Sequence, residues 1–272
     1  MQTVLIGLII CTFYFSSYAQ ETGNWDIVSE RGYRTADFLG ENAGWIGGYE
    51  CLIKTEDSGE TWNSIPVEED FYIIDLDFID NTTGWAVTYY NGVHPPYNSI
   101  WKTTNGGYTW ISQKVFSDYI RNHLLYAVDN GVVYLYTQFG DFFSILKTSD
   151  SGTIWNDITP NLVAAGIPNF RNEISFHSIK FFNADTGIII GDYDNGTGDP
   201  VFNRNGLILK TVDGGGTWQI NKISEFNHLG DIQCINDSSA YFVASVDSED
   251  FYEGYLCKTN DLFNSWTIVR QG

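Results

Sequence analysis

The chain has 272 residues and a formal net charge of −20 at pH 7, because 34 Asp and Glu outnumber 14 Lys and Arg. A protein that neutralises the phosphates of nucleic acid or of an anionic membrane needs a basic surface, so this charge argues against both as partners. It is compatible with cationic partners, and equally with an acidic surface that serves only solubility.

Residues 1–19 are predicted to form a secretory signal peptide. An apolar run from Val4 to Phe15 ends in Ser17-Tyr18-Ala19, which has the small residues of a cleavage site. The run is too short for a membrane-spanning helix, although Met1-Gln2-Thr3 lacks the usual basic residue. We therefore expect cleavage before Gln20, no membrane insertion afterwards, and a mature domain of residues 20–272 that is secreted or held in the cell envelope.

Five near-copies of one nine-residue pattern dominate the rest of the chain. Each begins with Lys-Thr, continues with Asp or Asn and, in four copies, Gly, and ends at Trp62, Trp110, Trp155, Trp218 or Trp266. An Asp or Asn side chain accepts hydrogen bonds from the amides of a following turn, and Gly supplies positive φ. The pattern therefore predicts a β-hairpin turn. Its intervals of 48, 45, 63 and 48 residues are close to the roughly 40–50 residues of a propeller blade.

Each repeat divides into four short predicted strands, as in a propeller blade. In chain order these are 35–39, 44–47, 51–55 and 62–67; 74–79, 84–88, 99–103 and 110–115; 124–128, 132–136, 144–148 and 155–158; 174–182, 187–191, 206–211 and 218–223; and 231–235, 240–244, 255–259 and 266–269. No stretch has a convincing helical period. Residues 25–28 match an outer strand without its three partners. Three interpretations stay open: five blades close with an extra strand, an incomplete sixth blade leaves the ring open, or the natural chain continues beyond Gly272.

The repeats resemble the Asp-box, or bacterial neuraminidase, repeat, whose pattern is Ser/Thr-x-Asp-x-Gly-x-Thr-Trp. Upstream, Gly44-Trp45-Ile46-Gly47, Gly84-Trp85-Ala86-Val87 and residues 187–191 resemble a strand of photosystem II assembly factors. The resemblance implies an all-β propeller of about five four-stranded blades, related to the sialidase-like superfamily. It also implies a structural role for the box residues, which are Asp57, Trp62, Asn105, Trp110, Asp150, Trp155, Asp213, Trp218, Asp261 and Trp266. The fifth copy has Phe263 in place of Gly, so we expect a looser turn there.

Three cysteines follow residue 19, namely Cys51, Cys234 and Cys257. In an oxidising compartment an odd number leaves at least one thiol free. A bridge between Cys234 and Cys257 is compatible with their places on the first and third strands of one repeat. We favour buried, small apolar roles for all three.

One face of such a propeller should be formed by two kinds of loop: those that join the second strand of a blade to the third, and those that join one blade to the next. We call it the loop face. Aromatic and acidic side chains there suit sugar stacking or a protein contact, while tolerated insertion is the alternative. The predicted ligand-binding residues are Tyr90, His94, Tyr97, Arg204, Phe251 and Tyr252.

Two further groups in these loops suggest chemistry. Asp192, Asp194 and Asp199 are candidate calcium ligands, because hard cations bind clustered oxygens; a solvated turn is the alternative, and no other cofactor is indicated. Arg34, Arg121 and Arg171 precede inner strands of three repeats, and three arginines hold the substrate carboxylate in sialidases. The Phe-Arg-Ile-Pro signature of sialidases is missing. The sequence therefore leaves enzymatic activity uncertain and favours a protein that is not an enzyme. The histidines show no ligand spacing.

The main hypothesis from sequence is a secreted, non-catalytic binding or scaffold propeller whose partner is a glycan or an extracellular protein. One alternative is a sialidase-like exo-glycosidase. Another is an assembly factor for a protein complex, of the photosystem II stability-factor type. The resemblance implies that such factors hold their partner through a basic patch, and the charge of −20 argues against the same partner here.

Overall fold

The computed structural model describes residues 32–68, 71–90, 97–116, 120–139, 142–167, 174–194, 204–247 and 252–271. These ranges contain five antiparallel sheets of four strands each, which confirms the predicted all-β, five-bladed propeller. The predicted signal peptide and the extra strand at residues 25–28 lie outside the described residues. In the described part, no helix is long and apolar enough to cross a membrane.

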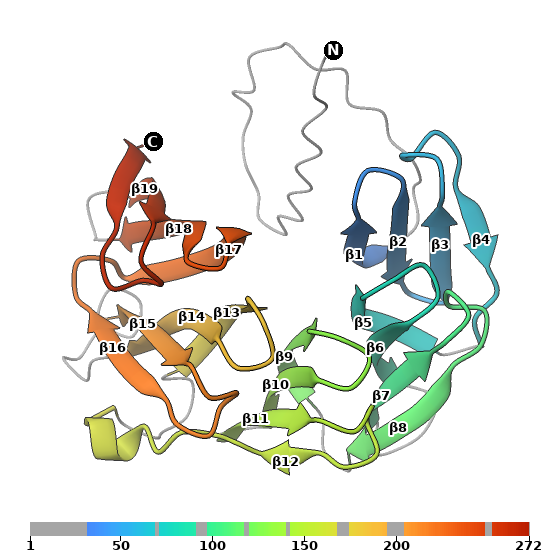
Figure 1. The fold of residues 1–272 in the computed structure, drawn as a ribbon, viewed down its shortest axis with the longest axis horizontal. Coiled ribbons are helices and arrows are strands. Elements are labelled where there is room, and N and C mark those ends of the chain that lie inside the picture. The colour runs from blue at the N-terminus through green and yellow to red at the C-terminus, as the bar shows by residue number, and fades with distance from the viewer. Residues whose placement is uncertain are drawn as a thin grey trace.

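The strands of each blade follow chain order from the inner to the outer edge (Figure 1). They are β1 (Tyr33–Leu39), β2 (Ala43–Gly48), β3 (Cys51–Thr55) and β4 (Asn63–Ile65) in blade one; β5 (Phe71–Phe78), β6 (Gly84–Tyr90), β7 (Tyr97–Thr103) and β8 (Ile111–Phe116) in blade two; β9 (Ile120–Ala127), β10 (Val133–Phe139), β11 (Phe142–Thr148) and β12 (Asn156–Asp157) in blade three; β13 (Ile174–Phe181), β14 (Gly187–Asp194), β15 (Arg204–Thr211) and β16 (Gln219–Ile223) in blade four; and β17 (His228–Asn236), β18 (Ser239–Asp247), β19 (Tyr252–Thr259) and β20 (Thr267–Gln271) in blade five. A 3₁₀ turn, η1 (Val163–Ala165), lies between blades three and four.

The five blades stand side by side in an arc, with the first and last flanking its opening (Figure 1). Inner strands pack in sequence, β1 on β5, β5 on β9, β9 on β13 and β13 on β17; within the described ranges no comparable contact joins β1 to β17.

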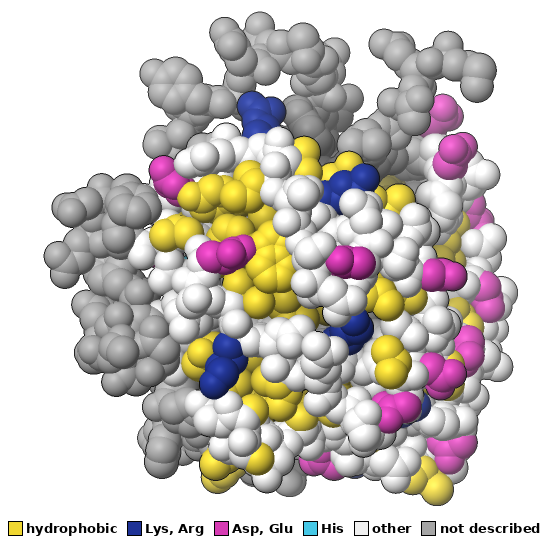
Figure 2. Space-filling view, turned by 60° about the vertical axis from the view of Figure 1, so that its left-hand side comes forward, with side chains coloured by type: hydrophobic (Ala, Val, Ile, Leu, Met, Phe, Trp, Pro, Cys, Tyr) yellow, Lys and Arg dark blue, Asp and Glu magenta, His cyan; other side chains and the backbone are white. Residues whose placement is uncertain are grey.

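Blade five exposes Val243 and Leu256, a cross-strand pair on its side away from blade four. Figure 2 turns the left-hand side of Figure 1 toward the viewer and shows hydrophobic side chains gathered on this side, with acidic side chains scattered around them.

The core lies between neighbouring blades, and the sheets of the interior blades are covered on both faces. Successive side chains of a strand point to opposite faces. Accordingly, Ile189 of β14 packs with blade three, whereas Ile188 and Ile190 pack with blade five. A continuous apolar run is therefore what an interior blade requires, and it accounts for the sequence Gly-Ile-Ile-Ile-Gly at residues 187–191.

A glycine at or next to the start of the second strand makes room for an aromatic ring in blades one, two and four. Phe78 pairs with Gly84 across β5 and β6, and its ring covers the glycine so closely that a Cβ there would lie 2.5 Å from Phe78 Cδ1. The other face of Phe78 stacks on Trp45 of blade one, with ring centroids 3.8 Å apart. The Gly-Trp pattern thus reflects a stack that joins two blades.

Each Asp-box forms a hydrogen-bonded turn between third and fourth strands. In the fourth copy, Thr211 Oγ1 donates to Asp213 Oδ1 at 2.9 Å and accepts from the Gly215 N–H at 2.8 Å, while Asp213 Oδ1 accepts from the Thr217 N–H at 2.8 Å. These bonds satisfy the backbone donors of the turn. The tryptophan that follows then packs toward the core.

The fifth box keeps this network, so our expectation of a looser turn is wrong. The N–H of Phe263 donates to Thr259 Oγ1 at 3.0 Å, and Asp261 Oδ1 accepts from the Ser265 N–H at 2.9 Å. Phe263 takes φ +60, which is unfavourable for a bulky residue. Its ring is buried against Phe242 with centroids 5.1 Å apart, and this burial offsets the backbone cost.

Acidic side chains of the inner strands connect one blade to the next. Asp37 Oδ2 accepts from the Phe78 N–H at 2.7 Å, Asp77 Oδ2 from the Ala127 N–H at 2.5 Å, and Asp75 Oδ2 from the Leu125 N–H at 2.8 Å. Loss of hydration on burial raises the pKa of all three carboxyl groups, that of Asp75 to about 6, although the backbone donors oppose the rise. These carboxyl groups therefore join blades at an electrostatic cost.

The cysteines are free thiols in the described residues. Cys51 and Cys257 are buried and Cys234 is partly buried. Burial raises the pKa of the Cys257 thiol to about 11. Cys51 and Cys257 thus fit the small apolar role expected from sequence.

Candidate functional site

A cluster of charged and histidine side chains lies between blades four and five at the loop face. Asp192 continues the line of Ile188 and Ile190 on β14, so it points toward blade five. It is only 1% exposed. Because a buried carboxylate needs partners, the side chains around Asp192 decide what the site can do.

Three side chains from the two blades bond directly to Asp192, and a fourth bonds to one of them. Its Oδ2 accepts from His177 Nε2 at 2.7 Å and from His228 Nδ1 at 2.9 Å, and its Oδ1 accepts from Arg204 Nε. His228 Nε2 lies 3.1 Å from Asp247 Oδ2. We call His177, Asp192, Arg204, His228 and Asp247 the Asp192 cluster.

The electrostatics of the cluster follow from these contacts. Burial alone would raise the pKa of Asp192, but hydrogen bonds from His177 and His228 and the charge of Arg204 outweigh it, so the pKa lies below its usual range. The hydrogen bond with Asp192 raises the pKa of His228 against the opposing effect of burial. Asp192 is therefore ionised at neutral pH.

A β-bulge places His177 in the cluster. The register of β13 and β14 passes from Phe176–Gly191 to Ser178–Ile190 and skips His177, whose side chain is thereby re-aimed. Equivalent shifts occur in β1 at Arg34 and in β5 at Ile74. The bulge is thus a repeated element, and the residue at it differs from blade to blade.

The structure brings together only some of the site residues that were predicted from sequence. Asp192 and Arg204 are brought together, as an ion pair, and Asp194 is the last residue of β14. Tyr252 is 66% exposed at the start of β19, and Arg34 is exposed on β1. His94, Arg171, Asp199 and Phe251, and the side chains of Tyr90, Tyr97 and Arg121, lie outside what the structure describes. The arginine, calcium and loop-ligand interpretations therefore stay predictions.

Sequence reasoning missed His177 and His228. They are 51 residues apart, about one repeat, and each lies in the first half of an inner strand of consecutive blades. That spacing was the available signal. It is weak because only the bulge in β13 and the packing of two blades bring both rings onto one carboxylate.

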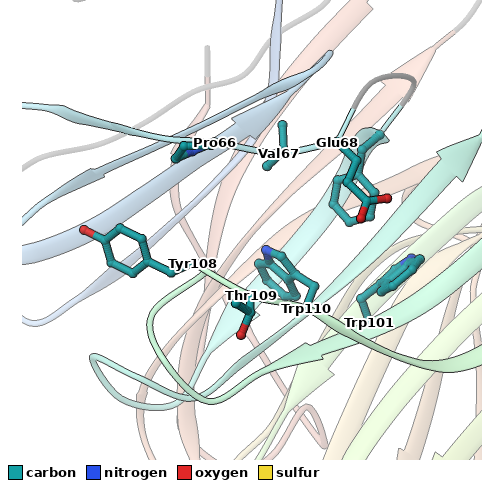
Figure 3. Close-up of a pocket in the computed structure, with 8 residues that line it drawn as sticks. Pro66, Val67, Glu68, Trp101, Tyr108, Thr109 and Trp110 are labelled. Carbon is teal, nitrogen blue, oxygen red and sulfur yellow. The ribbon is translucent and has the colours of Figure 1, made fainter.

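A second candidate is an aromatic groove on the outer flank between blades one and two (Figure 3). Figure 3 shows Pro66, Val67 and Glu68 along one side and Trp101, Tyr108, Thr109 and Trp110 along the other; Phe71 completes a cavity of about 200 Å³. Among these residues Glu68 is acidic and none is basic. Tyr108 is 58% exposed. The groove thus offers aromatic surface and negative charge.

Among the described residues, the contact between blades one and two at the groove lacks a hydrogen bond that joins blades three and four. Trp218 of the fourth box donates its indole N–H to the Ile158 carbonyl of the preceding blade at 2.9 Å. The equivalent indole N–H of Trp110 is buried and has no acceptor within the described ranges. Trp101 is held in place, since its indole N–H donates to Thr88 Oγ1 at 2.9 Å and its ring meets Phe71 edge-on. The groove therefore has a fixed aromatic floor.

Fold and turns together define the chain as a five-bladed β-propeller with Asp-box turns. No model of a known protein family matches it. Over 167 residues the sequence is 27% identical to the photosystem II assembly lipoprotein Ycf48 of Prochlorococcus marinus, a match that covers 56% of this chain and 46% of that protein. The chain is thus distantly similar to Ycf48, and the match spans less than half of that relative.

Solved structures are similar in fold. Ycf48 from Cyanidioschyzon merolae superposes with a TM-score of 0.50 and 14% identity over 89% of this chain and 86% of that one. An oligogalacturonate lyase from Vibrio parahaemolyticus superposes with a TM-score of 0.59 and 11% identity over 84% and 62%. At these identities the likeness concerns the propeller fold and not the activity.

Proposed function

We propose that this protein is a non-catalytic propeller that holds an exposed segment of another protein while a larger complex is assembled. The observation that carries the proposal is the aromatic groove between blades one and two. Aromatic side chains in a preformed hollow are the usual anchoring points of protein interfaces. The proposal takes up the assembly-factor alternative from sequence rather than the glycan interpretation.

The chemistry of the groove favours a particular partner. Its walls are apolar, and Glu68 together with the net charge of −20 attracts basic side chains. The indole N–H of Trp101 is already bonded to Thr88, so it is not available to a sugar hydroxyl. We therefore expect a peptide segment that combines an apolar or aromatic residue with Lys or Arg.

The sequence similarity to Ycf48 supports an assembly role, because that relative is named an assembly lipoprotein. The resemblance to photosystem II assembly factors implies a partner that binds a basic patch. Because this chain is acidic, its partner must be a different one. With the predicted signal peptide, the same similarity supports a place of action outside the cytoplasm.

The test is selection of binding peptides from a random display library, followed by affinity measurements with variants. Tyr108→Ala removes an exposed groove residue, and Tyr252→Ala removes a matched exposed tyrosine at the loop face of blade five. We expect basic-aromatic peptides whose dissociation constant rises about tenfold with Tyr108→Ala and stays unchanged with Tyr252→Ala.

Three outcomes contradict the proposal. The reverse order of effects would move binding to the loop face predicted from sequence. Binding to a glycan array by a protein that selects no peptide would establish the glycan interpretation. Peptides rich in Asp and Glu would refute the charge argument.

A further inference from the structure

We propose that His177, Asp192 and His228 form a binding site for one divalent transition-metal ion, zinc being the best match, which joins blades four and five. The ligand atoms are His177 Nε2, Asp192 Oδ2 and His228 Nδ1, which all lie within 4.8 Å of one another. The proposal is independent of the aromatic groove and of any protein partner.

The separations of the ligand atoms suit a shared ion. Two ligands at about 2.0–2.1 Å from one metal ion, at bond angles between about 90° and 110°, lie roughly 2.8–3.4 Å apart. Asp192 Oδ2 is 2.7 Å from His177 Nε2 and 2.9 Å from His228 Nδ1. Both distances to Asp192 Oδ2 are therefore close to the spacing of metal ligands. The ion would take the place of two N–H protons once the rings adjust so that His177 Nε2 and His228 Nδ1, which lie within 4.8 Å of each other, both reach it.

The surrounding groups have the arrangement expected around a metal site. A histidine ligand usually donates its second ring N–H to a carboxylate, which fixes the tautomer. His228 Nε2 is 3.1 Å from Asp247 Oδ2, so His228 keeps Nδ1 for the ion once its proton is on Nε2. Asp247 Oδ1 is buried and accepts no hydrogen bond from the described residues. This orphan acceptor is a second sign that the cluster is completed by a cation.

Arg204 orients the carboxylate without blocking it. Its Nε bonds Asp192 Oδ1 and leaves Oδ2 toward the two histidines. The carboxylates of Asp192 and Asp247 outnumber this one guanidinium, so the cluster keeps a negative charge when the histidines are neutral. Asp192 is buried, whereas the side chains of His177 and His228 are 41% and 33% exposed. An ion can therefore reach the site from the loop face.

The ligand set selects the class of metal. Two imidazole nitrogens and one carboxylate oxygen suit zinc and its neighbours in the first transition row, whereas calcium prefers six to eight oxygens. The site thus differs from the calcium loop predicted from Asp192, Asp194 and Asp199. Because His177 and Asp192 belong to blade four and His228 to blade five, binding should stabilise the contact between these blades.

The test is calorimetric titration of the full-length protein with zinc chloride, and separately with calcium chloride, for the unchanged chain and for His177→Gln, His228→Gln and Asp194→Asn. Thermal unfolding of each variant without metal checks the fold. We expect one zinc equivalent, a raised melting temperature, and an affinity reduced at least about tenfold in both histidine variants. Asp194→Asn should retain zinc binding.

The outcomes separate the alternatives. Absence of one-equivalent zinc binding, or binding that survives both histidine substitutions, would overturn the proposal. Binding of calcium that depends on Asp194 would replace it with the oxygen-ligand loop. Cobalt(II) gives an independent spectroscopic readout, since d–d absorption should appear with the unchanged chain and be absent with His177→Gln.

Discussion

Gly84→Ala should destabilise the propeller because Phe78 has no room to move. The added Cβ would lie 2.5 Å from Phe78 Cδ1, about 1 Å inside the normal carbon–carbon contact of about 3.5–4.0 Å. Behind Phe78 the Trp45 ring is stacked at 3.8 Å with an interplanar angle of 5°. Both rings are buried. The strain therefore cannot be relieved by a shift toward solvent.

The magnitude follows from two contributions. Overpacking of a close-packed core costs about 1–3 kcal/mol, and disruption of an aromatic stack costs about 0.5–1.5 kcal/mol more. We expect the free energy of unfolding to fall by about 2–4 kcal/mol in guanidinium titrations followed by tryptophan fluorescence. Backbone strain does not contribute, because Gly84 lies in strand β6 outside the left-handed region.

Gly254→Ala is the matched control. Gly254 also lies in a strand, β19, but no atom lies within 4 Å of its added Cβ, so we expect a change below about 0.5 kcal/mol. Combining Gly84→Ala with Phe78→Leu should cost less than the sum of the two single changes. Equal stability of the two alanine variants, or strict additivity of the pair, would refute the reasoning.

The remaining predictions concern a buried carboxyl group and the box. Because the pKa of Asp75 rises from 3.8 to about 6 on folding, its contribution to stability is complete below pH 4 and is lost as the pH rises through 6; it amounts to about 3 kcal/mol. Urea titrations at pH 4.5 and 7.5 should show a fall in stability that includes this contribution. Asp75→Asn should reduce the fall, and Asp37 and Asp77, whose pKa values are also raised, account for the rest; an unchanged fall in the variant would contradict the assignment. Thr211→Val removes the acceptor of the buried Gly215 N–H and should cost about 1–3 kcal/mol in the same assay. Asp213→Asn should leave the box formed, because Asn105 makes equivalent bonds in the second copy; a variant that unfolds would contradict this.

Most of the fold could be predicted because its signals are local. The box turn is specified within nine residues, and the predicted strand at 51–55 is β3 residue for residue. The predicted outer strand at 155–158 is shorter in the structure, where β12 covers Asn156–Asp157. Thr159 Oγ1 accepts from the Ile145 N–H at 2.8 Å and thereby replaces a strand carbonyl. A side chain that substitutes for the backbone is not visible in a strand pattern.

The site was less predictable because its parts are far apart in sequence. Asp192 and Arg204 were both singled out, but for different reasons and not as partners. Their pairing requires the register of β14 with β15, while His177 depends on a bulge and His228 on the packing of blade five against blade four. Similarly, the groove arises where the indole N–H of Trp110 lacks the acceptor that Trp218 has. None of these features is encoded by a short motif.

The joints between inner strands bear on how such a chain can change over evolutionary time. Asp37 and Asp77 accept from the N–H of Phe78 and Ala127, whereas Tyr126, at the equivalent register, donates its hydroxyl to the Phe181 carbonyl at 2.9 Å. The backbone of the residue in the following blade offers both an N–H donor and a carbonyl acceptor. The side chain in the preceding blade can therefore be either an acceptor or a donor, and the contact between the blades persists. Substitution at this position can therefore exchange an acidic side chain for a hydroxyl donor without separating the blades, so residue identity alone is a poor guide to where these joints lie.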